Sequence, residues 1–264
     1  MKTFRFVLVV FIGLAFSGLP GIADAKTGVI LMHGKGGTSK SRSPVGKLVS
    51  KLENAGFLVA APDMPWSRSR GFDKNHTDSM SEIDKIIAEL KSDGATKIVV
   101  GGHSIGANAA LAYAARHEGL AGVLAIAPGH IPEIEGFQGK MDFDYKRAKK
   151  MVDAGKGGEE DDFKDTNQGR KNTISTSAEI YLSWFDPKGP AVMPTNTANL
   201  KPGTPLMWII GEKDRMMDRG EGYAFAKAPV HDNNAYVVVK GGHGATPIKG
   251  AKKNHRLAEG ALAR

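Results

Sequence analysis

The stretch that decides the fold is Ile98-Val99-Val100-Gly101-Gly102-His103-Ser104-Ile105-Gly106. In it an apolar run leads directly into a Gly-x-Ser-x-Gly pentapeptide, and an alanine-rich helix is predicted over 105–116. A serine at such a strand-to-helix turn has a strained backbone, and its hydroxyl projects above the sheet. The positions two before and two after Ser104 must be tiny, because side chains there would collide across the turn. Gly102 and Gly106 satisfy this requirement, so the pattern predicts a nucleophilic serine at the end of a strand.

Apolar segments alternate with amphipathic ones along most of the chain. Helices are predicted at 45–55, 81–90, 105–116 and 246–263, and strands at 28–32, 57–61, 97–100, 120–127, 205–210 and 235–239. This alternation predicts an α/β fold in which a mainly parallel sheet has helices on both faces. Because sites in such sheets form at the carboxyl ends of the strands, the functional residues are expected there.

Residues 129–203 interrupt the alternation. The segment is charged, shows no obvious strand and sits between two predicted strands, so we interpret it as an inserted cap rather than a second domain. Helices are expected within it at 142–152 and 177–185. Tyr181, Trp184 and Phe185 are apolar enough either to form the core of this lid or to line a substrate pocket, and the sequence leaves both alternatives open.

An acidic run, Glu159-Glu160-Asp161-Asp162, lies inside the predicted cap. Calcium sites need oxygen ligands at an ordered spacing, and no such spacing is visible here. We therefore interpret the run as a solvated loop. We expect no metal site and no cofactor.

The first 25 residues are typical of a secretory signal peptide. Lys2 and Arg5 precede an apolar run over 6–19, and Ala23-Asp24-Ala25 is a small-x-small cleavage site. The apolar run is shorter than the roughly 20 residues that a transmembrane helix needs. We therefore expect a mature domain over 26–264, periplasmic or secreted and without stable membrane insertion; an uncleaved N-terminal anchor is the alternative.

The chain is basic, with 36 Lys and Arg against 28 Asp and Glu and a net charge of +8, and it contains no cysteine. It can therefore form no intramolecular disulfide. The basic residues are scattered, and the only cluster is Lys252-Lys253 with Arg256 nearby. Without an aromatic-interleaved basic stripe, we expect a solvated surface and no nucleic-acid partner.

Acyl transfer by a serine needs a base, an acid that orients the base, and donors for the developing oxyanion. Ser104 is the candidate nucleophile. His243, in a glycine-rich loop after the last predicted strand, is the candidate base, since neutral imidazole can accept the serine proton. Asp214 follows the strand before that one and is the candidate acid, with Glu212 and Asp218 as its rivals.

The first predicted strand is followed by His33-Gly34-Lys35-Gly36-Gly37. Such a turn can aim a backbone N–H at the oxyanion, and we assign this donor to Lys35, with Gly36 as the alternative. The second donor is expected to be the N–H of Ile105, at the positive end of its helix. A phosphate-binding loop is a poorer match because the required Gly-Lys-Ser/Thr ending is absent.

Together these motifs make the chain resemble the α/β-hydrolase superfamily. The resemblance rests on His33-Gly34-Lys35-Gly36-Gly37, Gly102-His103-Ser104-Ile105-Gly106, Gly211-Glu212-Lys213-Asp214 and Gly241-Gly242-His243-Gly244, in the Ser, Asp, His order of this fold. It implies a serine hydrolase triad and a lid after the strand that ends near Ala127. The two antiparallel strands that usually precede the first one have no room here, so about six strands are expected.

These expectations combine into an exported serine hydrolase that cleaves a small-molecule carboxylic ester through an acyl-enzyme. Thioesters and amides remain alternative substrates, because a triad and an oxyanion hole serve all acyl groups. A non-catalytic binding protein on a hydrolase scaffold is the alternative of a different class, since a fold does not fix a function.

Overall fold

The structure is a computed structural model that describes residues 26–40 and 42–251. The predicted signal peptide, the Lys252-Lys253 cluster and most of the predicted closing helix lie outside these residues. Within the described part, no helix is both long and apolar enough to cross a membrane.

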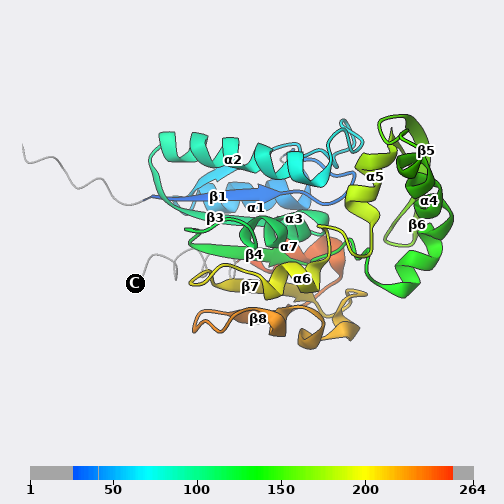
Figure 1. The fold of residues 1–264 in the computed structure, drawn as a ribbon. Helices are drawn as coiled ribbons and strands as arrows, with labels where there is room; N and C mark the ends of the chain where they lie inside the picture. Colours follow the sequence, from blue (N-terminus) through cyan, green and yellow to red (C-terminus); the bar gives the residue numbers. More distant parts are fainter. Residues whose placement is uncertain (1–25, 41, 252–264) are drawn as a thin grey trace, which may run out of the picture.

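A parallel sheet of six strands forms the centre of the molecule (Figure 1). In spatial order the strands are β2 (Leu58–Ala60), β1 (Lys26–Met32), β3 (Ala95–His103), β4 (Gly122–Ile126), β7 (Leu206–Gly211) and β8 (Ala235–Val239). Every neighbouring pair is parallel. The predicted α/β class and the six-stranded sheet are confirmed. β4 and β7 are buried along their whole length, as apolar strands covered on both faces should be.

Helices cover both faces of this sheet. On one face lie α1 (Pro44–Glu53) and the short α7 (Thr246–Lys249). On the other face lie α2 (His76–Ser92), α3 (Ile105–Ala114) and α6 (Met193–Ala198). All ten residues of α3 are buried, and its small alanine side chains allow the helix to lie close against the strands. The helix that follows Ser104 is therefore firmly held.

Beyond the carboxyl ends of the strands lies a separate group of elements, drawn in green at the right of Figure 1. It consists of α4 (Glu135–Asp153), β5 (Glu160–Asn167), β6 (Arg170–Ser177) and α5 (Ala178–Phe185). We call residues 135–185 the cap. The expectation that this region holds no strand was wrong, because β5 and β6 form an antiparallel hairpin.

The hairpin also changes the interpretation of the acidic run. Residues 160–162 begin β5 rather than forming a solvated loop, and the carboxylate of Asp161 pairs with Arg147 of α4. β5 is rich in acidic and polar residues, which have low strand propensity, so its conformation depends on pairing with β6 and on the burial of Phe163.

Helix capping explains where two helices begin. α2 starts at His76, earlier than predicted, because the Asn75 side chain accepts a hydrogen bond from the Asp78 N–H at 2.8 Å. α5 starts directly after Ser177, whose hydroxyl accepts from the Ile180 N–H at 3.4 Å.

Candidate active site

Ser104 occupies the turn between β3 and α3. Its φ of 59° and ψ of −120° place a non-glycine residue in a conformation that costs about 1–3 kcal/mol. The predicted need for small neighbours has a direct geometric basis. A Cβ atom on Gly102 would lie 2.5 Å from the carbonyl carbon of Gly106, and one on Gly106 would lie 2.6 Å from the Met32 oxygen. The surrounding backbone therefore permits only glycine at these two positions and fixes the sharp turn.

The side chains of Asp214 and His243 are joined by a hydrogen bond. His243 Nδ1 donates to Asp214 Oδ2 at 2.7 Å, and the Met216 N–H donates to Asp214 Oδ1 at 2.9 Å. Burial alone would raise the pKa of Asp214, but the hydrogen bond and charge of His243 outweigh it and hold that pKa below its usual value. The rivals Glu212 and Asp218 are exposed, and in the described part of the chain neither is paired with a histidine.

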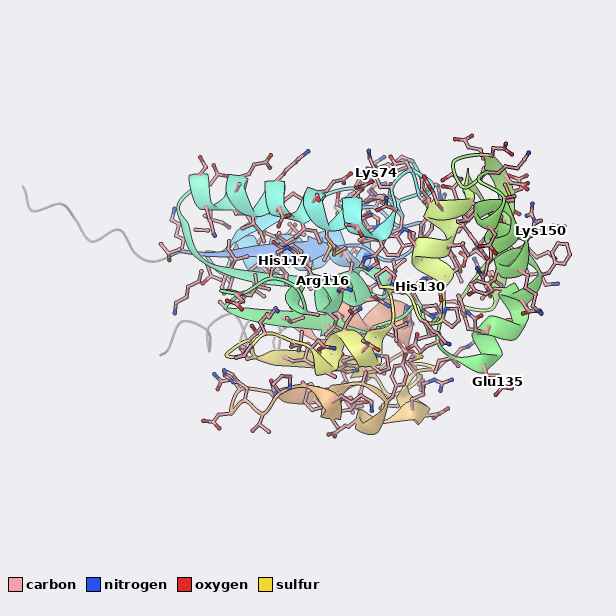
Figure 2. All side chains as sticks on the ribbon, in the orientation of Figure 1. Lys74, Arg116, His117, His130, Glu135 and Lys150 are labelled. Atoms are coloured by element: carbon pink, nitrogen blue, oxygen red, sulfur yellow. The ribbon has the colours of Figure 1, made fainter. Side chains whose placement is uncertain are left out.

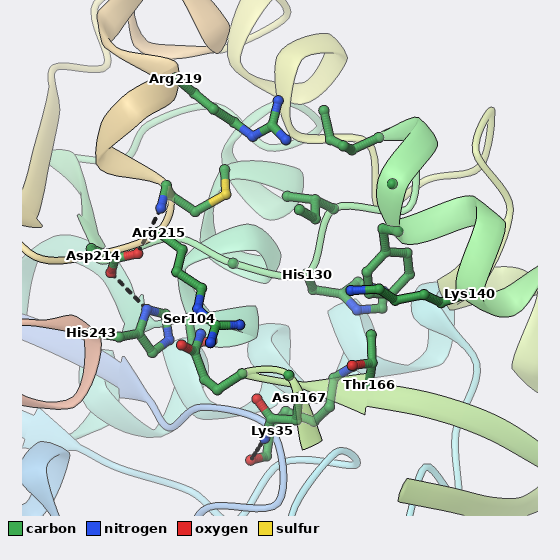
Figure 3. A pocket seen from close by; sticks show the side chains of 18 residues that line it. Lys35, Ser104, His130, Lys140, Thr166, Asn167, Asp214, Arg215, Arg219 and His243 are labelled. Atoms are coloured by element: carbon green, nitrogen blue, oxygen red, sulfur yellow. Dashed lines mark hydrogen bonds and ion pairs between the residues drawn. The ribbon is translucent and has the colours of Figure 1, made fainter. Parts of the chain in front are cut away.

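Ser104 and His243 line the same cavity of about 310 Å³ at the carboxyl ends of the strands (Figure 3). The space between them is kept open by Gly129, which follows β4. A Cβ atom there would lie 2.9 Å from Ser104 Oγ and 3.5 Å from His243 Cε1. Sequence reasoning missed Gly129, although its position just after a strand end was a usable signal.

The loop after β1 is fixed by buried hydrogen bonds. His33 Nδ1 donates to the Gly34 carbonyl at 2.8 Å, and His33 Nε2 accepts from the Met64 N–H at 3.0 Å. Trp66 Nε1 donates to the His33 carbonyl at 2.8 Å. Burial lowers the pKa of His33, which keeps the ring in the neutral form that this bonding pattern needs.

Backbone hydrogen bonds distinguish the two candidate donors of this loop. The Gly36 N–H donates to the Trp66 carbonyl at 2.8 Å and is already used. Among the residues that the structure describes, no acceptor occupies the Lys35 N–H. The Ile105 N–H belongs to the first residue of α3, and amides at this position have no partner within their helix. This arrangement favours Lys35 over Gly36, together with Ile105, as the pair of oxyanion donors.

His103 contacts the candidate base His243 through a hydrogen bond and through its ring. Its Nε2 donates to the His243 carbonyl oxygen at 3.0 Å, and the two rings lie 4.7 Å apart. Burial lowers the pKa of His103 to about 3, so this ring is neutral near pH 7. Sequence reasoning placed His103 in the pentapeptide but gave it no role.

Tyr181, Trp184 and Phe185 are buried within the cap and where it packs on the rest of the domain, and they do not line the cavity at Ser104. Trp184 packs edge-on against Trp66 and Phe72, with ring centroids 5.4 and 5.7 Å away. Tyr181 stacks on Phe185 at 4.3 Å. This placement favours the lid-core alternative over the pocket-wall alternative.

A Trp184→Ala substitution should therefore lower the free energy of unfolding by about 3–5 kcal/mol, as expected for a buried aromatic side chain. The preference among esters of different chain length should stay as in the wild type. Thermal melting and an ester chain-length profile measure the two effects. Phe143→Ala is the matched control, because Phe143 lies on the same cap but is 69% exposed. A changed ester chain-length profile with an unchanged melting temperature would instead support a position of Trp184 in the substrate pocket.

Several residues of the cavity wall were not predicted. They come from two separate places, the cap and the loop after β7, and they are Phe137, Lys140, Thr166, Asn167, Gln168, Gly169, Arg215, Met216 and Arg219. The only sequence feature that could have placed any of them in the wall was the position of Arg215 directly after Asp214. Over residues 26–40 and 42–251, no cluster of three or more His, Asp or Glu side chains could hold a metal ion.

The chain belongs to the alpha/beta hydrolase family, whose model matches residues 29–249. Membership supports hydrolase activity and confirms the resemblance drawn from the motifs. No curated protein sequence matches the chain.

Solved structures show the same fold. A monoacylglycerol lipase from Paleococcus ferrophilus has a TM-score of 0.62 and 22% identity, covering 90% of this chain and 96% of its own. Est1E from Butyrivibrio proteoclasticus, with ferulic acid bound, has a TM-score of 0.64 and 15% identity, covering 93% of both chains. A thioesterase domain from the curacin biosynthetic pathway has a TM-score of 0.51 and 16% identity, covering 89% and 92%. At these identities the similarity establishes the fold alone.

Proposed function

We propose that this protein is an exported serine hydrolase that cleaves a carboxylic ester of a small molecule through an acyl-enzyme. The observation that carries the proposal is the partly buried Asp214–His243 hydrogen bond, at 2.7 Å, beside a strained Ser104 in one shared cavity. The exported location rests on the signal-peptide features of residues 1–25.

In the first half of the reaction, Ser104 Oγ attacks the acyl carbon and His243 Nε2 accepts the hydroxyl proton. Asp214 holds the ring in the required tautomer and stabilises the imidazolium that forms. The tetrahedral oxyanion accepts hydrogen bonds from the backbone N–H groups of Lys35 and Ile105. When the intermediate collapses, His243 returns the proton to the leaving alcohol, and the acyl group stays on Ser104.

In the second half, water attacks the acyl-enzyme. His243 accepts a proton from this water, and the same two N–H groups stabilise the second oxyanion. Collapse returns the proton to Ser104 Oγ and releases the carboxylic acid. The chemistry needs no group beyond these side chains, backbone amides and water.

Ester cleavage is the preferred reaction because the lipase matches this fold with a TM-score of 0.62, against 0.51 for the thioesterase domain. The thioesterase domain keeps thioester cleavage as a second candidate. A cavity of about 310 Å³ lies at the lower end of the range for ligand pockets, which favours short substrates.

A fluorophosphonate probe tests the proposal directly. The purified protein should be labelled at Ser104, as located by peptide mass spectrometry, and should release nitrophenol from 4-nitrophenyl esters, faster from short acyl chains than from long ones. Heat-denatured protein is the control for nonspecific labelling. A folded protein that is neither labelled nor active on these esters and their thioester analogues would instead support a binding protein on a hydrolase scaffold.

A further inference from the structure

The wall of the cavity carries an excess of positive charge. Four cationic side chains line it: Lys35, Lys140, Arg215 and Arg219. Among the described residues of this lining, the only carboxylate is that of Asp214, which is hydrogen-bonded to His243. A substrate at Ser104 is therefore surrounded by cations that the proposed acyl chemistry does not use.

Two of these four cations have other partners. Lys35 Nζ donates to Asp165 Oδ1 at 2.6 Å, and both side chains are buried. The guanidinium of Arg219 lies 5.7 Å from the ring of Tyr223, whose hydroxyl donates to Glu133. Lys35 cannot bind a ligand without breaking its ion pair, and the contact with the Tyr223 ring limits how far the Arg219 guanidinium can move toward one.

Lys140 and Arg215 are different. Like Arg219, neither has a carboxylate partner within 4.0 Å in the described residues; unlike Arg219, neither lies over an aromatic ring, and both are exposed. Arg215 follows Asp214 and reaches the tip of the cap hairpin, since a Cβ atom on Gly169 would lie 2.8 Å from Arg215 Nη1. Figure 3 shows Lys140 extending toward the cavity from α4, whereas Arg215 extends from the loop after β7.

We propose that the substrate carries, in addition to its ester, a negatively charged group that Arg215 and Lys140 bind. This inference rests on the proposed function and names its substrate class. A guanidinium matches the two oxygens of a carboxylate or phosphate, and an ammonium adds a compact point charge. The position of both cations in the Ser104 cavity selects such an ester over a neutral one. Their field also attracts anions toward the cavity, an effect that salt screens.

The test compares two chromogenic esters that differ only in charge. One is mono-4-nitrophenyl adipate, which ends in a free carboxylate, and the other is the same compound with that carboxylate capped as a methyl ester. The measured quantity is kcat/KM for nitrophenol release from the charged ester divided by that from the capped ester. In the wild type this ratio should exceed one at low ionic strength and should fall toward one as salt is added.

Arg215→Gln and Lys140→Gln should each lower the ratio on the order of fivefold, the effect of losing one partly exposed charge contact. Since both esters meet the same variant, a general loss of activity cancels from the ratio. Lys150→Gln is the matched control, because Lys150 lies on α4 like Lys140 but does not line the cavity (Figure 2). The substitution removes one positive charge, as Lys140→Gln does. It should leave the ratio unchanged.

The outcomes separate the two proposals. If the capped ester is cleaved by Ser104 but the ratio is one or below and does not respond to Arg215→Gln or Lys140→Gln, the anionic substrate class is wrong and the serine hydrolase stands. A ratio that falls equally in Lys150→Gln would also overturn the inference, since it would reflect net charge alone. Cleavage of neither ester, with no fluorophosphonate labelling, would overturn the proposed function and the inference with it.

Discussion

Replacing Ser104 by alanine should lower ester turnover by about 10⁴-fold or more, while the fold remains intact. The substitution removes the oxygen that would attack the acyl carbon, and among the described residues that line the cavity the only other hydroxyl is that of Thr166, on the cap hairpin. His243→Ala should cause a comparable loss. The double variant should be little worse than either single one, because the residues act as a unit.

Turnover of a 4-nitrophenyl ester and circular dichroism measure activity and fold for each variant. Ser92→Ala is a suitable control, because Ser92 is an exposed residue at the end of α2. Near-wild-type hydrolysis by Ser104→Ala would contradict the assignment of the nucleophile. Strictly additive losses in the double variant would contradict the joint action of Ser104 and His243.

Asp214→Asn should lower turnover by roughly 10⁴-fold, the loss known for the same change in a well-studied serine protease triad. The carboxamide can donate a hydrogen bond where the carboxylate only accepts, so the His243 ring is no longer held in the tautomer that accepts the serine proton. Asp218→Asn is the control, because Asp218 is exposed nearby. If Asp218→Asn were the damaging change, the candidate acid would be misassigned.

The same substitution should change how stability depends on pH. Because the pKa of Asp214 is held below its usual value, its ionised carboxylate stabilises the fold above the ordinary aspartate pKa of about 4. This contribution is lost as the pH falls through the lowered pKa. Wild type should therefore lose more stability than Asp214→Asn when chemical unfolding is compared at neutral pH and in acid. Parallel curves would contradict the lowered pKa.

The central sheet was predictable because each strand is an apolar run bounded by glycine, proline or polar residues. β8 (Ala235–Val239) was predicted with its observed ends, and the other five strands were located with small shifts. The hairpin of the cap was not predictable in this way. β5 reads Glu-Asp-Asp-Phe-Lys-Asp-Thr-Asn, and its pairing with β6 and its packing on α4 are long-range contacts that no local pattern records.

The candidate site likewise has a part that could be predicted from the sequence and a part that could not. Ser104, Asp214 and His243 each follow a strand of the sheet, so the expectation of functional residues at the carboxyl ends of strands was sufficient to propose them, and in the structure all three line one cavity. Lys140 and Arg215 lie on segments whose meeting depends on how the cap folds over the sheet. Their charge in the cavity could not be derived from the sequence because no spacing relates them.

The buried ion pair between Lys35 and Asp165 restricts how the cap can be re-engineered. Lys35 belongs to the loop after β1, Asp165 belongs to the cap hairpin, and Asn167 Nδ2 also donates to the Lys35 carbonyl at 3.3 Å. Replacing the hairpin by one that lacks Asp165 would leave the Lys35 ammonium buried without its partner, at a cost of several kcal/mol. The cap is therefore not an exchangeable module. Grafting a different hairpin onto this scaffold would need a matching acid for Lys35, or a redesigned loop, to keep the backbone beside Ser104 in place.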